Sequence, residues 1–347
     1  MSGALVSESN SVLRMKDRAE RYKMSLTKDA RVATVILNYD DAADTLAAVD
    51  SLRLSENLDQ RLIVVDNNPD LVAQTWLASR LNRGIEYVAT GSNLGYAAGN
   101  NVGIRVAMEK RPEFLWILNP DVRVTPTTLT GLLAAATDAP DAGIVGGRIL
   151  HGGSRPQSIW FDGGIIDASR QGATSHVNSG KLHDSTPSRG IVDVDYVTGA
   201  CMLMRTRAVA QVGQIPEDYF LYFEETDYCK RMQAAGWRTV VNQAVVLSHF
   251  KRSSGDLPTA HYLYYMTRNR IHFADAYFVS EGSSAAALAD FTKVFLDPWR
   301  QRVAVRAPHW LNTFDAIVAT AIADADDGKM GKADILPAFP STEDGTE

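Results

Sequence analysis

The sequence predicts a three-layer α/β fold with a mainly helical C-terminal extension. Short, β-branched apolar runs alternate with helical segments between residues 31 and 118, a spacing typical of parallel strands joined by crossover helices. Polar residues follow three of these runs, at the edge where a doubly wound sheet places its ligand crevice. From Thr259 to about Met330 the pattern is mostly helical.

The first half of the chain predicts one βαβ unit and two further strands. A buried strand is expected wherever a short apolar run ends in a polar turn. The runs predict strands at 31–38, 62–65, 86–89 and 114–118, a helix at 41–52, and a glycine-rich loop at 91–103 that continues into a helix ending near Lys110.

The character of the sequence changes from Ile144 onward. Short strands are expected at 143–150, 157–161 and 190–197, with a polar, glycine-rich mobile loop at 172–189. A helix at 224–236 ends at Gly236, a residue suited to the C-cap. The next strand, 239–247, is followed closely by His249.

Composition limits the possible function classes. The chain has 347 residues, 45% of them hydrophobic, and a net charge of −6. This length supports one large domain with an appendage, and the charge argues against a nucleic-acid partner. Two cysteines, Cys201 and Cys229, suggest no disulfide framework or thiolate metal site.

The chain is expected to be cytoplasmic. Its first thirty residues are polar and lack the apolar core of a signal peptide, and no later segment could span a bilayer. Any membrane contact would be peripheral. Arginines mixed with tryptophans at 297–302 and 306–310 could rest on an anionic membrane, or the tryptophans could fill a core. The sequence leaves open whether the chain forms a homo-oligomer.

Candidate ligand-binding residues stand at predicted strand ends. Asn38, Asp66 and Asn119 each end an apolar run, and Asp121 follows in a tight Asn-Pro-Asp turn that could hold a hard cation. A strand end needs a polar turn in any case, so each residue also has a purely structural interpretation. Asp227 faces Arg231 four residues later on the predicted helix, which favours an ion pair.

Several motifs occur in an order that resembles the family 2 glycosyltransferases, most closely their rhamnosyltransferase-like branch, which also contains galactofuranosyltransferases. The resemblance covers roughly residues 31–332. The motifs are Val65-Asp66-Asn67-Asn68, the run from Asn93-Leu94-Gly95-Tyr96 to Gly103, Leu118-Asn119-Pro120-Asp121, Gly199-Ala200-Cys201, Phe223-Glu224-Glu225-Thr226-Asp227, Arg268-Asn269 and Asp326-Asp327-Gly328.

The resemblance implies a GT-A fold, a Rossmann-like fold of nucleotide-diphospho-sugar transferases. The expected regions are a polar segment at 1–30, a catalytic domain at 31–255 with a donor half (31–125) and an acceptor half (143–255), and a helical region at 256–347. It implies acceptor contacts at Gly199 and Tyr222. The implied contacts to the donor nucleotide are Asn38, Asp66, Asn67, Asn93, Gly95, Gly99, Asn101, Asn119 and Asp121.

The resemblance also implies a divalent cation, Mg²⁺ or Mn²⁺. Asp121 occupies the last position of the family's Asp-X-Asp motif, and Asn119 replaces the first aspartate. His249 resembles a histidine that supplies a further metal ligand. This site would carry less charge than one with two aspartates, so diphosphate oxygens and water are expected to complete it.

Glu225 is the expected general base, and Glu224 is the alternative. The family pattern has an acidic pair here, usually ending in aspartate, whereas this chain has Glu224-Glu225. The two glutamates could instead only place negative charge at a helix N-terminus.

The implied activity is inverting sugar transfer from a nucleoside diphosphate donor to a hydroxyl of a glycan, glycolipid or metabolite. Rhamnose from dTDP-rhamnose is the first choice; galactofuranose or an N-acetylhexosamine from a UDP-sugar is the alternative. A nucleotidyltransferase fits less well, because acidic residues follow the first strand. A non-catalytic nucleotide-sugar-binding protein is the remaining alternative. The Gly-X-Gly-X-X-Gly dehydrogenase fingerprint is absent.

Overall fold

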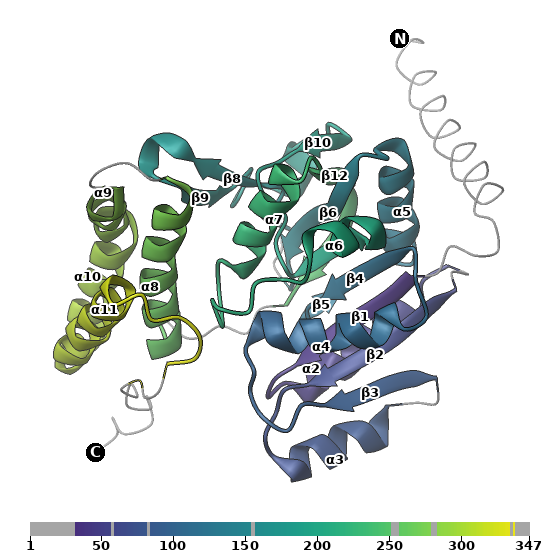
Figure 1. Ribbon diagram of the computed structural model, residues 1–347, viewed down its shortest axis with the longest axis horizontal. Coiled ribbons are helices and arrows are strands. Elements are labelled where there is room, and N and C mark those ends of the chain that lie inside the picture. Colours follow the sequence, from purple (N-terminus) through teal and green to yellow (C-terminus); the bar gives the residue numbers. More distant parts are fainter. Residues whose placement is uncertain are drawn as a thin grey trace.

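The computed structural model describes residues 32–56, 59–81, 84–153, 157–250, 257–278, 283–333 and 336. A ten-stranded mixed sheet forms its centre, with the strand order β10-β12-β6-β11-β4-β1-β2-β3, while β5 pairs with β12 and β7 pairs with β6. A separate hairpin is formed by β8 and β9. Helices flank the sheet, and α8 to α11 stand as a group beside it (Figure 1).

The strands are β1 (Val32–Asn38), β2 (Gln60–Asp66), β3 (Ile85–Ala89), β4 (Phe114–Leu118), β5 (Val122–Arg123), β6 (Ala142–His151), β7 (Ile159–Phe161), β8 (Gly164–Asp167), β9 (Ala173–His176), β10 (Ile191–Asp193), β11 (Cys201–Arg205) and β12 (Arg238–His249). The α-helices are α2 (Ala42–Arg53), α3 (Leu71–Arg80), α4 (Tyr96–Met108), α5 (Thr128–Asp138), α6 (Thr206–Val212), α7 (Glu224–Ala234), α8 (Ala260–Tyr277), α9 (Ser283–Phe291), α10 (Asp297–Arg306) and α11 (Leu311–Asp326).

The first half of the sheet is parallel, as the alternation of strands and helices predicts. Strand β1 pairs in parallel with β2 and β4, and its register sets Asn38 opposite Asp66. All seven residues of β1 are buried, as expected for a strand covered by helices on both faces. The predicted carboxyl edge therefore exists, and Asn38, Asp66 and Asn119 lie along it.

Two predicted loops are wrong in part. Helix α4 already begins at Tyr96, inside the predicted loop at 91–103. Gly99 suits this helix because a Cβ there would lie 2.5 Å from the Leu37 Cδ1 atom, so the missing side chain permits close packing on β1. The predicted mobile loop at 172–189 contains β9, which pairs with β8.

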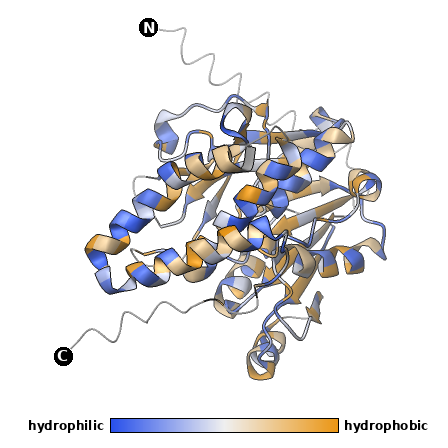
Figure 2. Cartoon of the chain, turned by 60° about the vertical axis from the view of Figure 1, so that its left-hand side comes forward, coloured by the Kyte–Doolittle hydropathy of each residue, from blue (hydrophilic) through white to orange (hydrophobic). Residues whose placement is uncertain are grey.

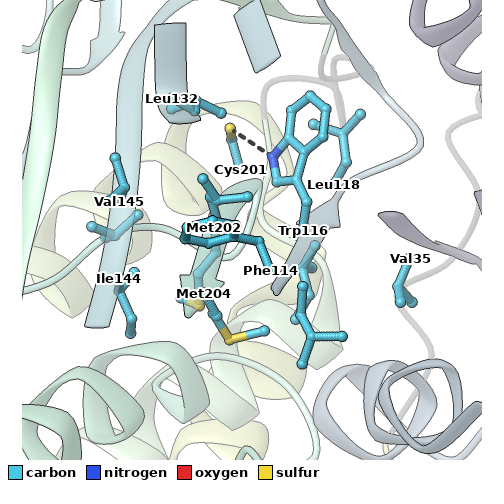
Figure 3. Close-up of a cluster of buried hydrophobic side chains, with 14 of the residues drawn as sticks. Val35, Phe114, Trp116, Leu118, Leu132, Ile144, Val145, Cys201, Met202 and Met204 are labelled. Atoms are coloured by element: carbon cyan, nitrogen blue, oxygen red, sulfur yellow. Dashed lines mark hydrogen bonds between the residues drawn. The ribbon is translucent and has the colours of Figure 1, made fainter. Parts of the chain in front are cut away.

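The main core lies where β4, β11 and β6 meet the helices. Trp116 of β4 is fully buried, and its Nε1 donates to Cys201 Sγ of β11 at 3.4 Å (Figure 3). In Figure 2 orange tones dominate the central strands, whereas the helices carry both colours. This pattern is what a three-layer fold requires, since each helix has one face toward the sheet.

The C-terminal helices have a core of their own, built largely from α8, α10 and α11. Trp310 belongs to this core and the partly buried Trp299 packs against it, so both tryptophans of the arginine-rich region contribute to the interior. No helix among the described residues is long and apolar enough to cross a membrane. The predicted polar segment at 1–30 and the polar end of the chain lie outside the described residues, and the domain boundaries stay predictions.

Candidate active site

One cavity of about 470 Å³ lies between the sheet and α8. Its walls come from the β4–β5 connection, β7, β9, the segment before β11, the turn before α7, the end of β12, and α8. Seven predicted site residues line it, although the chain separates them widely: Asn119, Asp121, Gly199, Tyr222, Glu224, Glu225 and His249.

Asp121 and His249 are neighbours because β5 pairs with the end of β12. Val122 lies opposite His249 in this antiparallel pair, and the Phe250 amide donates to the Asp121 carbonyl at 2.7 Å. His249 Nε2 is 2.9 Å from Asp121 Oδ2, but the two atoms are not aligned as a hydrogen bond. His249 Nε2 and Asp121 Oδ1 are buried without any hydrogen-bond partner among the described residues.

A carboxylate and an imidazole that point at one place without a hydrogen bond fit a shared divalent cation. The ring of Trp160 packs against that of His249 at 4.4 Å between centroids, which restricts the imidazole's orientation. No group of three or more His, Cys, Asp or Glu residues suited to a metal occurs in the part of the chain that the structure describes.

Glu224 and Glu225 begin α7 and face the same cavity. Burial raises the pKa of Glu224 well above its ordinary value, and the adjacent Glu225 charge raises it further. Burial also raises the pKa of Glu225, while the amides at the start of the helix partly offset this effect. Glu224 Oε2 has no hydrogen-bond partner among the described residues, so one buried carboxylate oxygen is left for a ligand.

The third acid of this helix is engaged elsewhere. Asp227 forms the predicted ion pair with Arg231, with Nε to Oδ1 at 2.6 Å. The Tyr277 hydroxyl also donates to Asp227 Oδ1 at 2.7 Å. These contacts confirm the ion pair and leave Glu224 and Glu225 as the acids of the cavity.

The predicted donor contacts at the ends of β1 and β2 lie outside this cavity. Asp66 is fully buried, and its Oδ1 accepts from Asn38 Nδ2 at 2.8 Å while its Oδ2 accepts from the Tyr87 hydroxyl at 2.8 Å. Asn67 Nδ2 donates to the Gly95 carbonyl at 2.9 Å. The structure thus gives Asn38, Asp66 and Asn67 partners within the protein.

The residues around the start of α4 also have internal partners. Asn93 Oδ1 accepts from the Gly95 amide at 3.0 Å. Gly95 has a φ of 88°, a conformation that favours glycine. Asn101 Nδ2 donates to the Ile215 carbonyl at 2.8 Å, so this side chain ties α4 to the 214–217 segment, away from the cavity.

Sequence reasoning missed several aromatic residues of the cavity wall. They are Tyr96, Trp160, Tyr196 and Tyr262, joined by His176 and Met266. Tyr96 belongs to the Asn93–Gly103 motif, and its hydroxyl donates to the Gly199 carbonyl at 2.7 Å. The other aromatic residues carried no signal, because a tryptophan or tyrosine next to a strand or on a helix usually belongs to a core.

The sequence matches the family described as Glycosyl transferase family 2 over residues 33–213. The chain is 28% identical over 172 residues to the low-salt glycan biosynthesis hexosyltransferase Agl10 of Haloferax volcanii, which is 49% of this chain and 52% of that protein. It therefore spans about half of that relative. It is 29% identical over 230 residues to the N-acetylglucosaminyl-diphospho-decaprenol L-rhamnosyltransferase of Mycobacterium tuberculosis, covering 60% of this chain and 71% of that protein.

A solved structure has the same overall fold. The mannosyltransferase PcManGT from Pyrobaculum calidifontis, in complex with GDP-Man and Mn²⁺, superposes with a TM-score of 0.51 over 94% of this chain and 97% of that chain, at 15% identity. This similarity concerns the fold alone and agrees with the expected GT-A architecture. Because the family match extends over more than half of the residues, the chain belongs to glycosyl transferase family 2.

Proposed function

We propose that the chain is an inverting, cation-assisted glycosyltransferase that moves a sugar from a nucleoside diphosphate to an acceptor hydroxyl. The observation that carries this proposal is the shared cavity. Three separate parts of the chain supply Asp121, His249 and the pair Glu224 and Glu225, and all four residues line the same cavity. A cation ligand pair and a base are the two groups that this chemistry needs together.

Glu225 takes the proton of the acceptor hydroxyl in this mechanism. The acceptor oxygen bonds to the anomeric carbon as the bond from that carbon to the diphosphate breaks, so the configuration inverts and the nucleoside diphosphate leaves. A raised pKa makes Glu225 a stronger base than an exposed carboxylate. Glu224, which is more deeply buried, would accept a hydrogen bond from a second hydroxyl of the acceptor.

Asp121 and His249 would hold the divalent cation, either Mg²⁺ or Mn²⁺. Their unpartnered buried atoms, Oδ1 and Nε2, support this assignment. When bound, the cation supplies positive charge that offsets the charge growing on the departing diphosphate. Asn119 adds no negative charge, which is consistent with a site completed by the substrate.

The donor nucleotide would lie beyond the cation, along the carboxyl edge of the sheet. Asn38, Asp66 and Asn67 would form its polar floor, and Asn93 and Gly95 would flank it. Rhamnose from dTDP-rhamnose is the proposed donor because the Mycobacterium tuberculosis relative is named as a rhamnosyltransferase. Galactofuranose or an N-acetylhexosamine from a UDP-sugar remains the alternative.

A lipid-linked saccharide is the proposed acceptor. The name of the same relative includes a decaprenol diphosphate. Val305 is 80% exposed on α10, with exposed Arg302 and Arg306 nearby, and this combination would suit contact with an anionic membrane surface. Cell-envelope polysaccharide synthesis is the process in which such an acceptor would be used.

A transfer assay across nucleoside diphosphate sugars tests the proposal. Purified protein is incubated with dTDP-rhamnose, UDP-galactofuranose or UDP-N-acetylglucosamine, Mn²⁺ and a lipid-linked saccharide, and the glycosylated product is measured by mass spectrometry. We expect product from one donor and none with excess chelator. Donor binding with neither transfer to an acceptor nor release of nucleoside diphosphate would favour the non-catalytic binding protein.

A further inference from the structure

The turn that leads into Glu224 has a strained backbone. Phe220, Tyr222 and Phe223 have φ angles of 65°, 67° and 75°, in the left-handed region that is unfavourable for residues with a Cβ atom. Such residues keep this conformation only where their surroundings hold it. Because α7 begins directly after the turn, its shape fixes where Glu224 and Glu225 lie.

Asn269 of α8 holds this turn by its carbonyl groups. Its Nδ2 lies 3.1 Å from the Tyr219 carbonyl oxygen, 2.8 Å from that of Leu221 and 2.9 Å from that of Tyr222. The amide group has two hydrogens, so both are used and one is shared. Asn269 is fully buried, and a buried donor set of this kind is costly to remove.

Arg268 fixes both the amide and the turn. Its Nε donates to Asn269 Oδ1 at 2.9 Å, which orients the Nδ2 group toward the turn. Its Nη2 donates to the Tyr219 carbonyl at 2.9 Å, and its Nη1 donates to the Gly331 carbonyl at 2.7 Å. The Gly331 amide in turn donates to the Asp218 carbonyl at 2.5 Å.

The donor side of the protein contacts the same turn from the opposite direction. The Tyr96 amide, at the start of α4, donates to the Phe220 carbonyl at 2.7 Å. A Cβ atom on Gly95 would lie 2.5 Å from that carbonyl oxygen. The turn therefore connects the N-terminus of α4 with the helical C-terminal region.

We propose that Asn269 is a positioning residue for sugar transfer, which acts through the Tyr219–Phe223 turn to hold Glu225 at the reacting centre. The proposal rests on the proposed function only in naming Glu225 as the base. The C-terminal helices would then position the general base, in addition to any contact they make with the acceptor. A merely structural Asn269 would support stability and leave the chemistry unchanged.

Three variants separate these two roles. Asn269→Ala removes both donors, Asn269→Ser replaces them with one hydroxyl donor on a shorter side chain, and Thr267→Val is the matched control. Thr267 is equally buried on α8, but its hydroxyl donates to the Leu263 carbonyl within the same helix at 2.7 Å. We expect kcat to fall about 100-fold in Asn269→Ala, as for a misplacement of about 1 Å, and less in Asn269→Ser, while the donor KM changes less than about twofold.

Hydrogen exchange provides a readout that is independent of activity. Each variant is measured at the same number of degrees below its own melting temperature. We expect the backbone amides of residues 220–225 to exchange faster in Asn269→Ala than in Thr267→Val. Unchanged kcat with a lowered melting temperature, or unchanged exchange in the turn, would overturn the proposal. If Asn269→Ala does not fold, Asn269→Ser alone decides between these outcomes. Failure of the wild-type protein to transfer any sugar would instead refute the proposed function, and the exchange data would still test the turn.

Discussion

Two polar regions at the same edge of the sheet differ in how their buried groups are paired. At the ends of β1 and β2, Asp66 accepts hydrogen bonds from Asn38 and Tyr87. In the cavity, Asp121 Oδ1, His249 Nε2 and Glu224 Oε2 have no hydrogen-bond partner among the described residues. Because an unpaired buried polar atom costs about 1–3 kcal/mol, the cavity carries a penalty that a ligand would remove. The first region therefore forms a rigid polar floor beside which the nucleotide would lie, whereas the second holds the groups proposed to take part in the chemistry.

The largest effect is expected at the base. Glu225→Gln should lower kcat about 10²–10⁴-fold, the contribution typical of general base catalysis, with donor binding measured by calorimetry unchanged. Glu109→Gln, an exposed change at the end of α4, is the control. A larger loss in Glu224→Gln than in Glu225→Gln would exchange the roles of the two residues.

An effect of intermediate size is expected at the cation ligands. His249→Ala should weaken the apparent affinity for Mn²⁺ about 10–100-fold, as for other changes next to a metal, measured from the Mn²⁺ dependence of transfer. His261→Ala changes an exposed histidine outside the cavity and should leave this dependence unchanged. Equal Mn²⁺ curves for the two variants would remove His249 from the site.

The paired region should respond in stability instead. Asp66→Asn places an amide donor against the groups that now donate to the carboxylate, so the free energy of unfolding should fall by about 1–3 kcal/mol. Denaturant titration measures this change in the free energy of unfolding. Asp50→Asn, on the exposed face of α2, is the control. An Asp66→Asn protein with unchanged stability would contradict this pairing, whereas weakened donor binding beside the lost stability would agree with Asp66 in the floor of the donor site.

The smallest effect concerns the pH dependence of stability. The pKa of Glu224 is raised above its ordinary 4.5, so between that value and the raised pKa the folded state holds a proton that the unfolded state has lost. Stability therefore falls as pH rises through this window. Glutamine has no titrating proton. The melting temperature of Glu224→Gln, relative to that of the wild type, should therefore rise between pH 5 and pH 8. A constant difference across that range would mean that Glu224 is not buried as a neutral acid.

The sequence allowed the sheet to be predicted better than the helices. The runs that became β1, β2 and β4 are mainly apolar and end in polar turns, a local signal that tertiary contacts do not override. Residues 71–80, for which no element was expected, form α3. Gly99 and Gly103 favoured a loop, but their missing side chains let α4 pack on β1, so packing decided the structure there.

The site was predictable only through the order of its motifs. Spacing along the chain gives no indication that Asp121 and His249 are neighbours, since the pairing of β5 with β12 creates that contact. The turn at 219–223 could not be predicted at all. Aromatic residues seldom adopt a positive φ, and the group that holds them there, Asn269, belongs to a helix later in the chain.

A manganese anomalous diffraction map tests the difference between the two regions most directly. Crystals would be soaked in Mn²⁺ and a nucleoside diphosphate, and the position of the metal would be read from the anomalous peak. We expect one peak within coordination distance of the Asp121 carboxylate and His249 Nε2, with Glu225 facing the space beside the diphosphate. A peak at the Asn38 and Asp66 strand ends, or one that neither Asp121 nor His249 contacts, would contradict the assignment of the cavity.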